Sequence, residues 1–222
     1  MANRYLRRTT LYVEGRDDLF TIANLLKAHS LQMDDKPRDV EIHGAALDDK
    51  GLGRDELLKL VEPAVKASTG KAVGFIIDAD ASAPATWDSI RQRVEVASGK
   101  KSKLPKKCPK DGAVSDILEL KSRVGVWIMP DNSNPGMLED FLQRLVDEKD
   151  KLLPLAKSST TEAKKTGAAF HATAEPKAVV HAWLAWQADP GCPFGTAIKA
   201  KYFDIDSPSA KEFLAWVRRL VD

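Results

Sequence analysis

Several features that would narrow the function of this chain are missing from its sequence. Only two cysteines occur, Cys108 and Cys192, too few for a metal-thiolate cluster or a disulfide framework. No apolar run approaches the roughly 18–20 residues needed to cross a bilayer. Neither the phosphate-binding loop G-x-x-x-x-G-K-[ST] nor the dinucleotide fingerprint G-x-G-x-x-G is present. These absences argue against a secreted disulfide scaffold, a membrane-spanning protein and an ATP motor.

Charge is abundant but has little excess of either sign. The 222 residues include 34 Lys and Arg against 32 Asp and Glu, a formal net charge of +2. This balance neither demands nor excludes nucleic acid as a partner. The first residues, "MANRYLRRTTLYVEG", lack the long apolar core of a signal peptide. We therefore expect a cytoplasmic protein without a membrane partner.

Apolar strands alternate with amphipathic helices over the first 150 residues. Strands are expected at 9–13, 40–43, 73–77 and 124–129, and helical spacing follows each of them. The last two runs are apolar on both faces, which is typical of parallel strands covered by helices on both sides. Residues 1–150 are thus predicted to form an open α/β domain, with a mainly parallel four-stranded sheet and helices on both faces.

The character of the chain changes from residue 151. An Ala-, Lys- and Thr-rich stretch leads into amphipathic segments that are broken once by proline and glycine. Residues 151–222 are therefore predicted to form a helical C-terminal region packed on the sheet domain. Trp183, Trp186 and Trp216 fall on these predicted helices, and we expect them in the core.

Three of the predicted strands end in acidic residues. Glu14 follows the first, Asp78 and Asp80 follow the third, and Asp131 follows the fourth. The carboxyl ends of parallel strands meet at the edge where ligands bind, and residues two apart on an extended chain point the same way. Carboxylates gathered there repel one another, and Mg²⁺, which takes oxygen ligands, would relieve the repulsion. Each acid taken singly is better explained as a cap or a solvent-facing side chain, and only the three strand ends taken together favour a metal site.

A further acid follows the fourth strand. Asn134 and Pro135 suit the cap and first position of a helix. Glu139 would then lie near the helix N-terminus, where the dipole favours acid. Glu139 is a candidate metal ligand that also has a sufficient structural explanation.

A lysine-rich segment, "GKKSKLPKKCPK", cannot be a core element and is expected to be an exposed loop. Its Lys100, Lys101 and Lys103 could bind phosphates by counterion release, or could simply be solvated. Arg16 follows Glu14-Gly15 and is a second candidate for a phosphate contact at the same edge.

The motifs at these strand ends carry a resemblance to a known family. "LYVEGRDD" followed by "IIDADA" resembles the Toprim domain of topoisomerases and primases, over roughly residues 9–146. "VGVWIMPDNSNPGMLEDFL" and "HAWLAWQADPGCPFGTAI" are similar to a family of small, standalone Toprim-like prokaryotic proteins of unassigned activity. The resemblance implies that Glu14 is a general acid/base or metal ligand, and that Asp78 and Asp80 bind Mg²⁺ or Mn²⁺.

The segment after the fourth strand departs from the topoisomerase and primase pattern. Toprim nucleases of the overcoming-lysogenization-defect type carry extra acids after the core, so Asp131 and Glu139 are candidates for a second metal site. A topoisomerase would need a tyrosine nucleophile in a suitable context, and a primase would need a zinc-binding module.

Two functions remain open from the sequence. The first is Mg²⁺-dependent phosphodiester chemistry on DNA or RNA, with a nuclease favoured by elimination. The second is a non-catalytic Toprim-like module that binds nucleic acid, nucleotide or a partner protein such as an ATPase. Retained acids favour the enzyme, whereas the short chain without an obvious DNA-binding domain favours the module.

Overall fold

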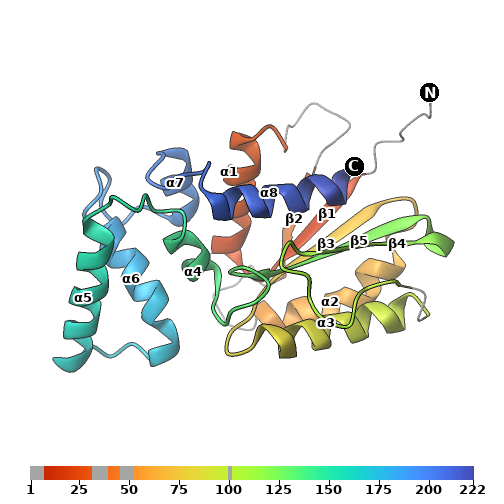
Figure 1. Ribbon diagram of the computed structural model, residues 1–222, viewed down its shortest axis with the longest axis horizontal. Helices are drawn as coiled ribbons and strands as arrows, with labels where there is room; N and C mark the ends of the chain where they lie inside the picture. The colour runs from red at the N-terminus through yellow and green to blue at the C-terminus, as the bar shows by residue number, and fades with distance from the viewer. Residues whose placement is uncertain (1–7, 32–39, 46–52, 100–101) are drawn as a thin grey trace.

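The computed structural model describes residues 8–31, 40–45, 53–99 and 102–222 (Figure 1). The strands are β1 (Thr9–Val13), β2 (Val40–Gly44), β3 (Ala72–Asp78), β4 (Ala113–Ile117) and β5 (Ser122–Met129). The α-helices are α1 (Arg16–Ala28), α2 (Gly53–Lys66), α3 (Ala83–Ala97), α4 (Leu138–Gln143), α5 (Leu152–Lys165), α6 (Glu175–Leu184), α7 (Phe194–Lys199) and α8 (Pro208–Val221). Two short 3-10 turns, η1 (Leu118–Leu120) and η2 (Ala172–Ala174), complete the elements.

The strands form one mixed sheet in the order β2-β1-β3-β5-β4. The first four in this order run parallel, and β4 pairs antiparallel with β5 at the edge. The prediction of a four-stranded sheet was wrong because β4 adds a fifth strand. The inward-facing row of β4 consists of Ala113, Ser115 and Ile117, all buried. A small apolar residue and a buried serine in that row weaken the alternating pattern by which a strand is recognised.

Helices cover both faces of the sheet, as predicted (Figure 1). On one face α2 and α3 enclose an apolar cluster that includes Phe75 and Trp87. On the other face α1 and α8 share a cluster with Leu11 and Trp127 of the sheet. This second cluster continues into the C-terminal helices, so the sheet and the C-terminal region bury apolar surface together.

A buried tryptophan attaches α8 to the sheet. Trp216 is fully buried, and its indole N–H donates to the carbonyl oxygen of Ala113 at 3.0 Å. Its ring lies 5.8 Å from that of Trp127, measured between centroids. A Cβ atom at Gly112 would lie 2.6 Å from the Trp216 ring, and one at Gly125 would lie 3.2 Å from it. The two glycines therefore leave the space that the indole occupies.

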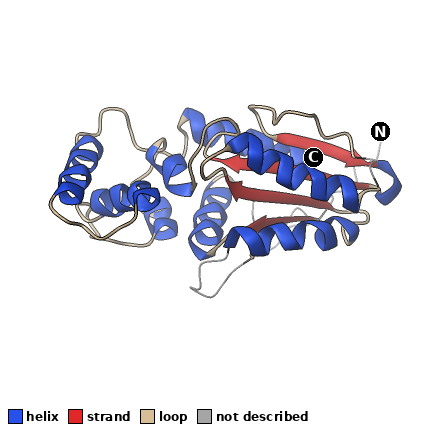
Figure 2. Cartoon of the chain, turned by 90° about the horizontal axis from the view of Figure 1, so that it is seen from below, coloured by secondary structure: helices blue, strands red, loops and turns tan. Residues whose placement is uncertain are grey.

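The pair α5 and α6 extends beside the sheet rather than covering it (Figures 1 and 2). Trp183 of α6 is buried with its ring 5.0 Å from that of Phe203, and it belongs to the same apolar cluster as α8. The prediction that Trp186 lies in the core was wrong. It follows the end of α6 and is 42% exposed. The domain boundary near residue 150 stays a prediction.

Within the described part of the chain, no helix has the length and apolar character that a membrane span requires.

Candidate functional site

The direction in which the chain adds successive strands to the sheet reverses between β1 and β3. These strands are neighbours, yet α1, which follows β1, lies on the α8 face, and α3, which follows β3, lies on the opposite face. In open α/β sheets, ligands bind outside the carboxyl ends of the strands at such a topological switch point. Glu14 directly follows β1, and Asp78 is the last residue of β3. The structure thus places both predicted acids at the switch point.

Backbone amides hold the two carboxylates at this point. The N–H of Asp78 donates to Oε1 of Glu14 at 2.8 Å, and the N–H of Leu138 donates to Oδ1 of Asp78 at 3.0 Å. The second hydrogen bond links the end of β3 to the first turn of α4. Within the described residues, the remaining oxygen of each carboxylate accepts no hydrogen bond.

Two acids from helix N-termini join this pair. Asp18, in the first turn of α1, accepts the N–H of Gly15 at 3.2 Å. Glu139, in the first turn of α4, is buried with 6% of its surface exposed. Asp18 and Glu139 both interact electrostatically with Asp78. We call Glu14, Asp18, Asp78 and Glu139 the carboxylate cluster.

Burial and the charges of neighbouring acids raise the pKa of every carboxyl in the cluster. Desolvation is the largest cause throughout. It raises the pKa of Glu14 to about 8 and that of Asp18 to about 7, with further increases from neighbouring acids. The pKa of Asp78 lies well above its usual range because of burial and the nearby charges of Asp18, Glu14 and Glu139. The cluster therefore favours either bound protons or a bound cation.

A lysine from the C-terminal region lies at the side of the cluster. Nζ of Lys177 on α6 is 3.8 Å from Oε1 of Glu139 and 3.3 Å from Oδ2 of Asp17. Burial still raises the pKa of Glu139, although the positive charge of Lys177 opposes that rise. This contact connects the region after residue 150 with the switch point.

Asp80 does not share the orientation expected from an extended chain. β3 ends at Asp78, and Asp80 has a left-handed backbone with φ of 49°. Its carboxylate lies 2.7 Å from the guanidinium of Arg54, which also donates to the carbonyl oxygen of Asp78 at 3.0 Å. The charge of Asp80 still contributes to the raised pKa of Glu14 and of Asp78. Asp80 therefore lies near the cluster but already has a cationic partner.

Asp131 has a local set of partners instead. It accepts hydrogen bonds from the N–H groups of Ser133 and Asn134, and from Arg144 at 2.6 Å. Burial alone would raise its pKa, but the hydrogen bonds from Asn134, Arg144 and Ser133 lower it. Asn134 thus binds Asp131 and does not cap a helix. The helix α4 begins at Leu138 with Met137 as its cap, so the predicted start at Asn134 and Pro135 was wrong.

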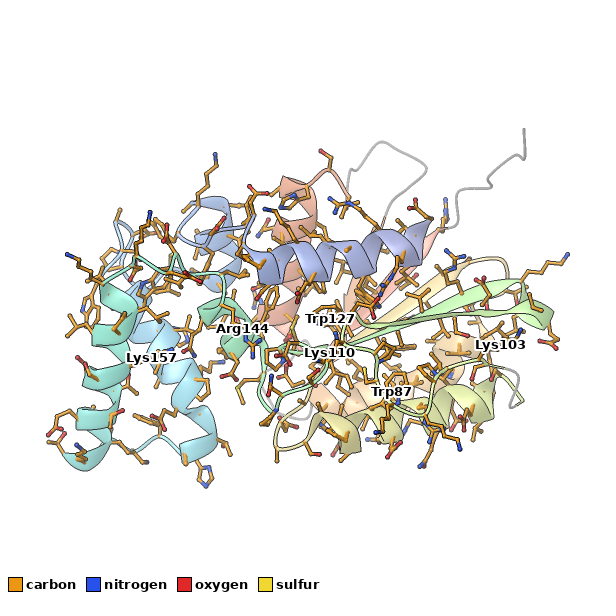
Figure 3. The ribbon with its side chains drawn as sticks, in the orientation of Figure 1. Trp87, Lys103, Lys110, Trp127, Arg144 and Lys157 are labelled. Atoms are coloured by element: carbon orange, nitrogen blue, oxygen red, sulfur yellow. The ribbon has the colours of Figure 1, made fainter. Side chains whose placement is uncertain are left out.

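The predicted phosphate contacts are dispersed. Arg16 is exposed, and its guanidinium carbon lies 5.6 Å from the ring centre of Phe20. Lys103 is exposed, and its backbone N–H donates to Oγ of Ser115 at 3.0 Å, beside the middle of β4 (Figure 3). Lys100 and Lys101 lie outside the described residues.

Sequence reasoning missed three participants. Asp18 was not predicted as a site residue, although it lies four residues after Glu14 in the same motif; it accepts the N–H of Gly15, the cap residue of α1. Arg54 had no motif of its own. Lys177 lies 160 residues from its partner Asp17 in the sequence, so no local pattern predicts the contact.

The chemistry of the cluster suits a hard divalent cation, because all of its donors are carboxylate oxygens. The geometry of the cluster does not by itself identify a metal site. In the part of the chain that the structure describes, no group of three or more His, Cys, Asp or Glu side chains is arranged to hold a metal ion. The hydrogen bonds from Asp78 N–H and Leu138 N–H take up one oxygen each of Glu14 and Asp78. The other oxygen of each residue remains for a cation or a proton.

Comparisons with curated proteins and with solved structures return no match. A comparison with protein families matches residues 8–222, nearly the whole chain, to a single family. The chain therefore belongs to the family described as Protein of unknown function (DUF3226).

Proposed function

We propose that this protein cleaves phosphodiester bonds in nucleic acid with the help of Mg²⁺ or Mn²⁺, as a Toprim-type nuclease. One observation carries the proposal. Glu14 and Asp78 meet at the topological switch point within a cluster of acids whose pKa values are raised by burial and by the charges of neighbouring acids. The resemblance of the Glu-Gly and Asp-x-Asp motifs to the Toprim pattern supports the same function.

In this proposal Glu14 moves the proton. In the absence of a cation, burial raises the pKa of Glu14 to about 8, so this carboxyl can take up and release a proton near neutral pH and is suited to protonate the leaving oxygen. The N–H of Asp78 fixes the position of the Glu14 carboxyl by binding Oε1. The other oxygen then carries the exchangeable proton toward the substrate.

The remaining acids hold the cation. Asp78 and Asp80 are the proposed ligands, and Glu139 is a proposed additional one. When bound, the cation would orient the phosphodiester and stabilise the charge that develops on it. Asp131 is a weaker candidate than Asp80, because both of its oxygens already accept hydrogen bonds, whereas among the described residues only Oδ2 of Asp80 does.

A second function is favoured by a different observation. Arg54 already neutralises Asp80, and Lys177 lies beside Glu139, so two of the acids have protein cations as partners. A non-catalytic module that binds nucleic acid, nucleotide or a partner ATPase would need no metal at this edge. Cleavage activity distinguishes the two functions.

The direct test is incubation with labelled DNA and RNA in the presence of Mg²⁺, Mn²⁺ or chelator. The wild type should cleave only with a divalent cation, and Asp78→Ala should abolish cleavage. Glu162→Gln is the matched control, because Glu162 is an exposed acid on α5 paired with Lys165. Activity that persists in Asp78→Ala, or no cleavage of any substrate by a folded wild type, would reject the nuclease in favour of the module.

A further inference from the structure

A lysine-bearing segment runs along the carboxyl edge of the sheet beside β5. Because β4 is antiparallel to β5, the residues before Ala113 lie toward the carboxyl end of β5. The amide Nδ2 of Asn132, three residues past the end of β5, donates to the carbonyl oxygen of Lys110 at 3.1 Å. Figure 3 shows Lys110 near the centre of the molecule and Lys103 farther to the right of the view. Lys110 is thus beside the edge that also carries Glu14 and Asp78.

Buried side chains hold the backbone of this segment. The indole N–H of Trp87, which is 1% exposed, donates to the carbonyl oxygen of Lys106 at 3.2 Å. Asn132, which is 3% exposed, holds Lys110, and its own Oδ1 accepts the N–H of Ile128 in β5 at 2.8 Å. At the far end, Arg219 of α8 donates to the carbonyl oxygen of Gly112 at 2.9 Å. The segment is therefore fixed to α3, to the loop after β5 and to α8.

The side chains of the segment remain available. Lys106, Lys107 and Lys110 are all exposed, and none of them pairs with an acid among the described residues. The one acid of the segment, Asp111, pairs with Arg219. Three positive charges on a fixed backbone lose less entropy on binding than the same charges on a free chain.

We infer that residues 106–112 bind the backbone of a nucleic-acid strand and direct it across the carboxyl edge toward the cluster. This inference rests on the proposed function, and it names the part of the surface that binds the substrate. Neighbouring strands lie about 4.8 Å apart, so β4 is three spacings, roughly 14 Å, from β1, which corresponds to about four nucleotides at an axial rise of 3.4 Å per nucleotide of one strand. The lysines would contact phosphates a few positions from the bond placed at Glu14.

Binding is measured by fluorescence anisotropy of labelled single-stranded DNA and RNA in chelator, so that cleavage plays no part. The triple variant Lys106→Gln, Lys107→Gln, Lys110→Gln should bind at least tenfold more weakly at low salt. Its slope of log K against log salt should be shallower by about 2, because each lysine releases about 0.7 counterion from a single strand. The matched control is Lys157→Gln, Lys199→Gln, Lys211→Gln, which removes the same charge from exposed positions on α5, α7 and α8.

Two further variants separate charge from position. A triple Lys→Arg variant at 106, 107 and 110 should bind as the wild type does. Trp87→Phe removes the N–H that holds Lys106 while keeping an aromatic ring, and it should weaken binding several-fold with the salt slope unchanged. Melting curves of each variant establish that it is folded.

The inference is overturned if the folded triple Gln variant binds both strands as tightly as the matched control does. It is also overturned if the wild type binds neither DNA nor RNA. Heparin serves as a second polyanion: if the triple variant loses binding to heparin but not to DNA or RNA, the lysines bind a different polyanion and the inference fails. A wild type that binds through these lysines but never cleaves would support the inference while rejecting the nuclease. A wild type that cleaves nucleic acid but whose binding does not depend on these lysines would support the nuclease and reject the inference.

Discussion

Among the described residues, a backbone amide and no cationic side chain holds Asp78 at the end of β3. Its Oδ1 accepts the N–H of Leu138, while Asp18, Glu14 and Glu139 raise its pKa. An asparagine keeps an oxygen for Leu138 and removes the negative charge. An alanine removes both, and it leaves the Leu138 N–H without its partner. These two substitutions therefore separate the hydrogen bond from the repulsion.

We expect Asp78→Asn to raise the melting temperature in chelator at pH 8, because it relieves repulsion within the cluster. Asp78→Ala should be less stable than Asp78→Asn by about 1–3 kcal/mol, the cost of an unsatisfied amide. Added Mg²⁺ should raise the melting temperature of the wild type, since a ligand of the native state stabilises it, but not that of Asp78→Asn. An Asp78→Asn variant that melts below the wild type in chelator would contradict this account of the cluster.

Arg54 joins three parts of the edge. It donates to the carbonyl oxygen of Asp78, to Oδ2 of Asp80, and to Oγ1 of Thr86 on α3 at 2.8 Å. Arg54→Met should cost about 2–3 kcal/mol of unfolding free energy, because hydrogen bonds to a charged group are lost and Thr86 is buried. Lys59→Met, an exposed position on the same helix, is the control. Urea denaturation measures both, and equal stabilities would show that Arg54 is not structural.

The acids at strand ends could be predicted from local sequence, whereas their partners could not. Glu14 and Asp78 follow apolar runs, and the topology of a parallel sheet brings such ends together. The orientation expected for Asp80 was wrong because the chain leaves the extended conformation after Asp78. Lys177 reaches the cluster through a fold contact between distant segments, which no local pattern encodes.

At the scale of elements, long apolar strands were predictable and the short edge strand was not. β3 and β5 are apolar on both faces because helices cover both sides of the sheet. β4 is five residues long and buries a serine, so its pattern resembles that of a loop. The start of α4 was also mispredicted from a local pattern. Asn134 is a residue type that often caps helices, but its side chain donates to Asp131 instead.

Attachment of α8 to the sheet depends on Trp216. We expect Trp216→Ala to cost about 3–5 kcal/mol, because it removes a fully buried ring and leaves the space beside Gly112 and Gly125 empty. Trp186→Ala removes the same side chain from a position that is 42% exposed, so it should cost well under half as much. Chemical denaturation of both variants measures the difference. Equal losses would mean that the apolar cluster under α8 contributes little.

The whole molecule should lose stability as pH rises, because its buried acids hold protons in the folded state. The pKa of Glu14 rises from 4.5 to about 8 on folding, and that of Asp18 from 3.8 to about 7. Between the unfolded and folded values the native state binds more protons than the unfolded chain. The stabilisation is therefore complete below the unfolded pKa values and is lost as pH rises through about 7 and 8. His181, whose pKa burial lowers, acts with the opposite sign near its ordinary pKa.

We expect the unfolding free energy in chelator to fall by a few kcal/mol between about pH 5 and pH 9, as measured by urea denaturation. Glu14→Gln keeps an acceptor for the Asp78 N–H but cannot titrate, so its stability should depend less on pH than that of the wild type. The His181 contribution is the same in both proteins, and the difference between the two curves isolates Glu14. Saturating Mg²⁺ should flatten the wild-type curve at high pH, since a cation replaces the lost protons as the partner of the carboxylates. A wild-type stability that is constant or rises from pH 5 to pH 9 in chelator would show that these carboxyls ionise freely, and the cluster would then have no electrostatic reason to bind a cation.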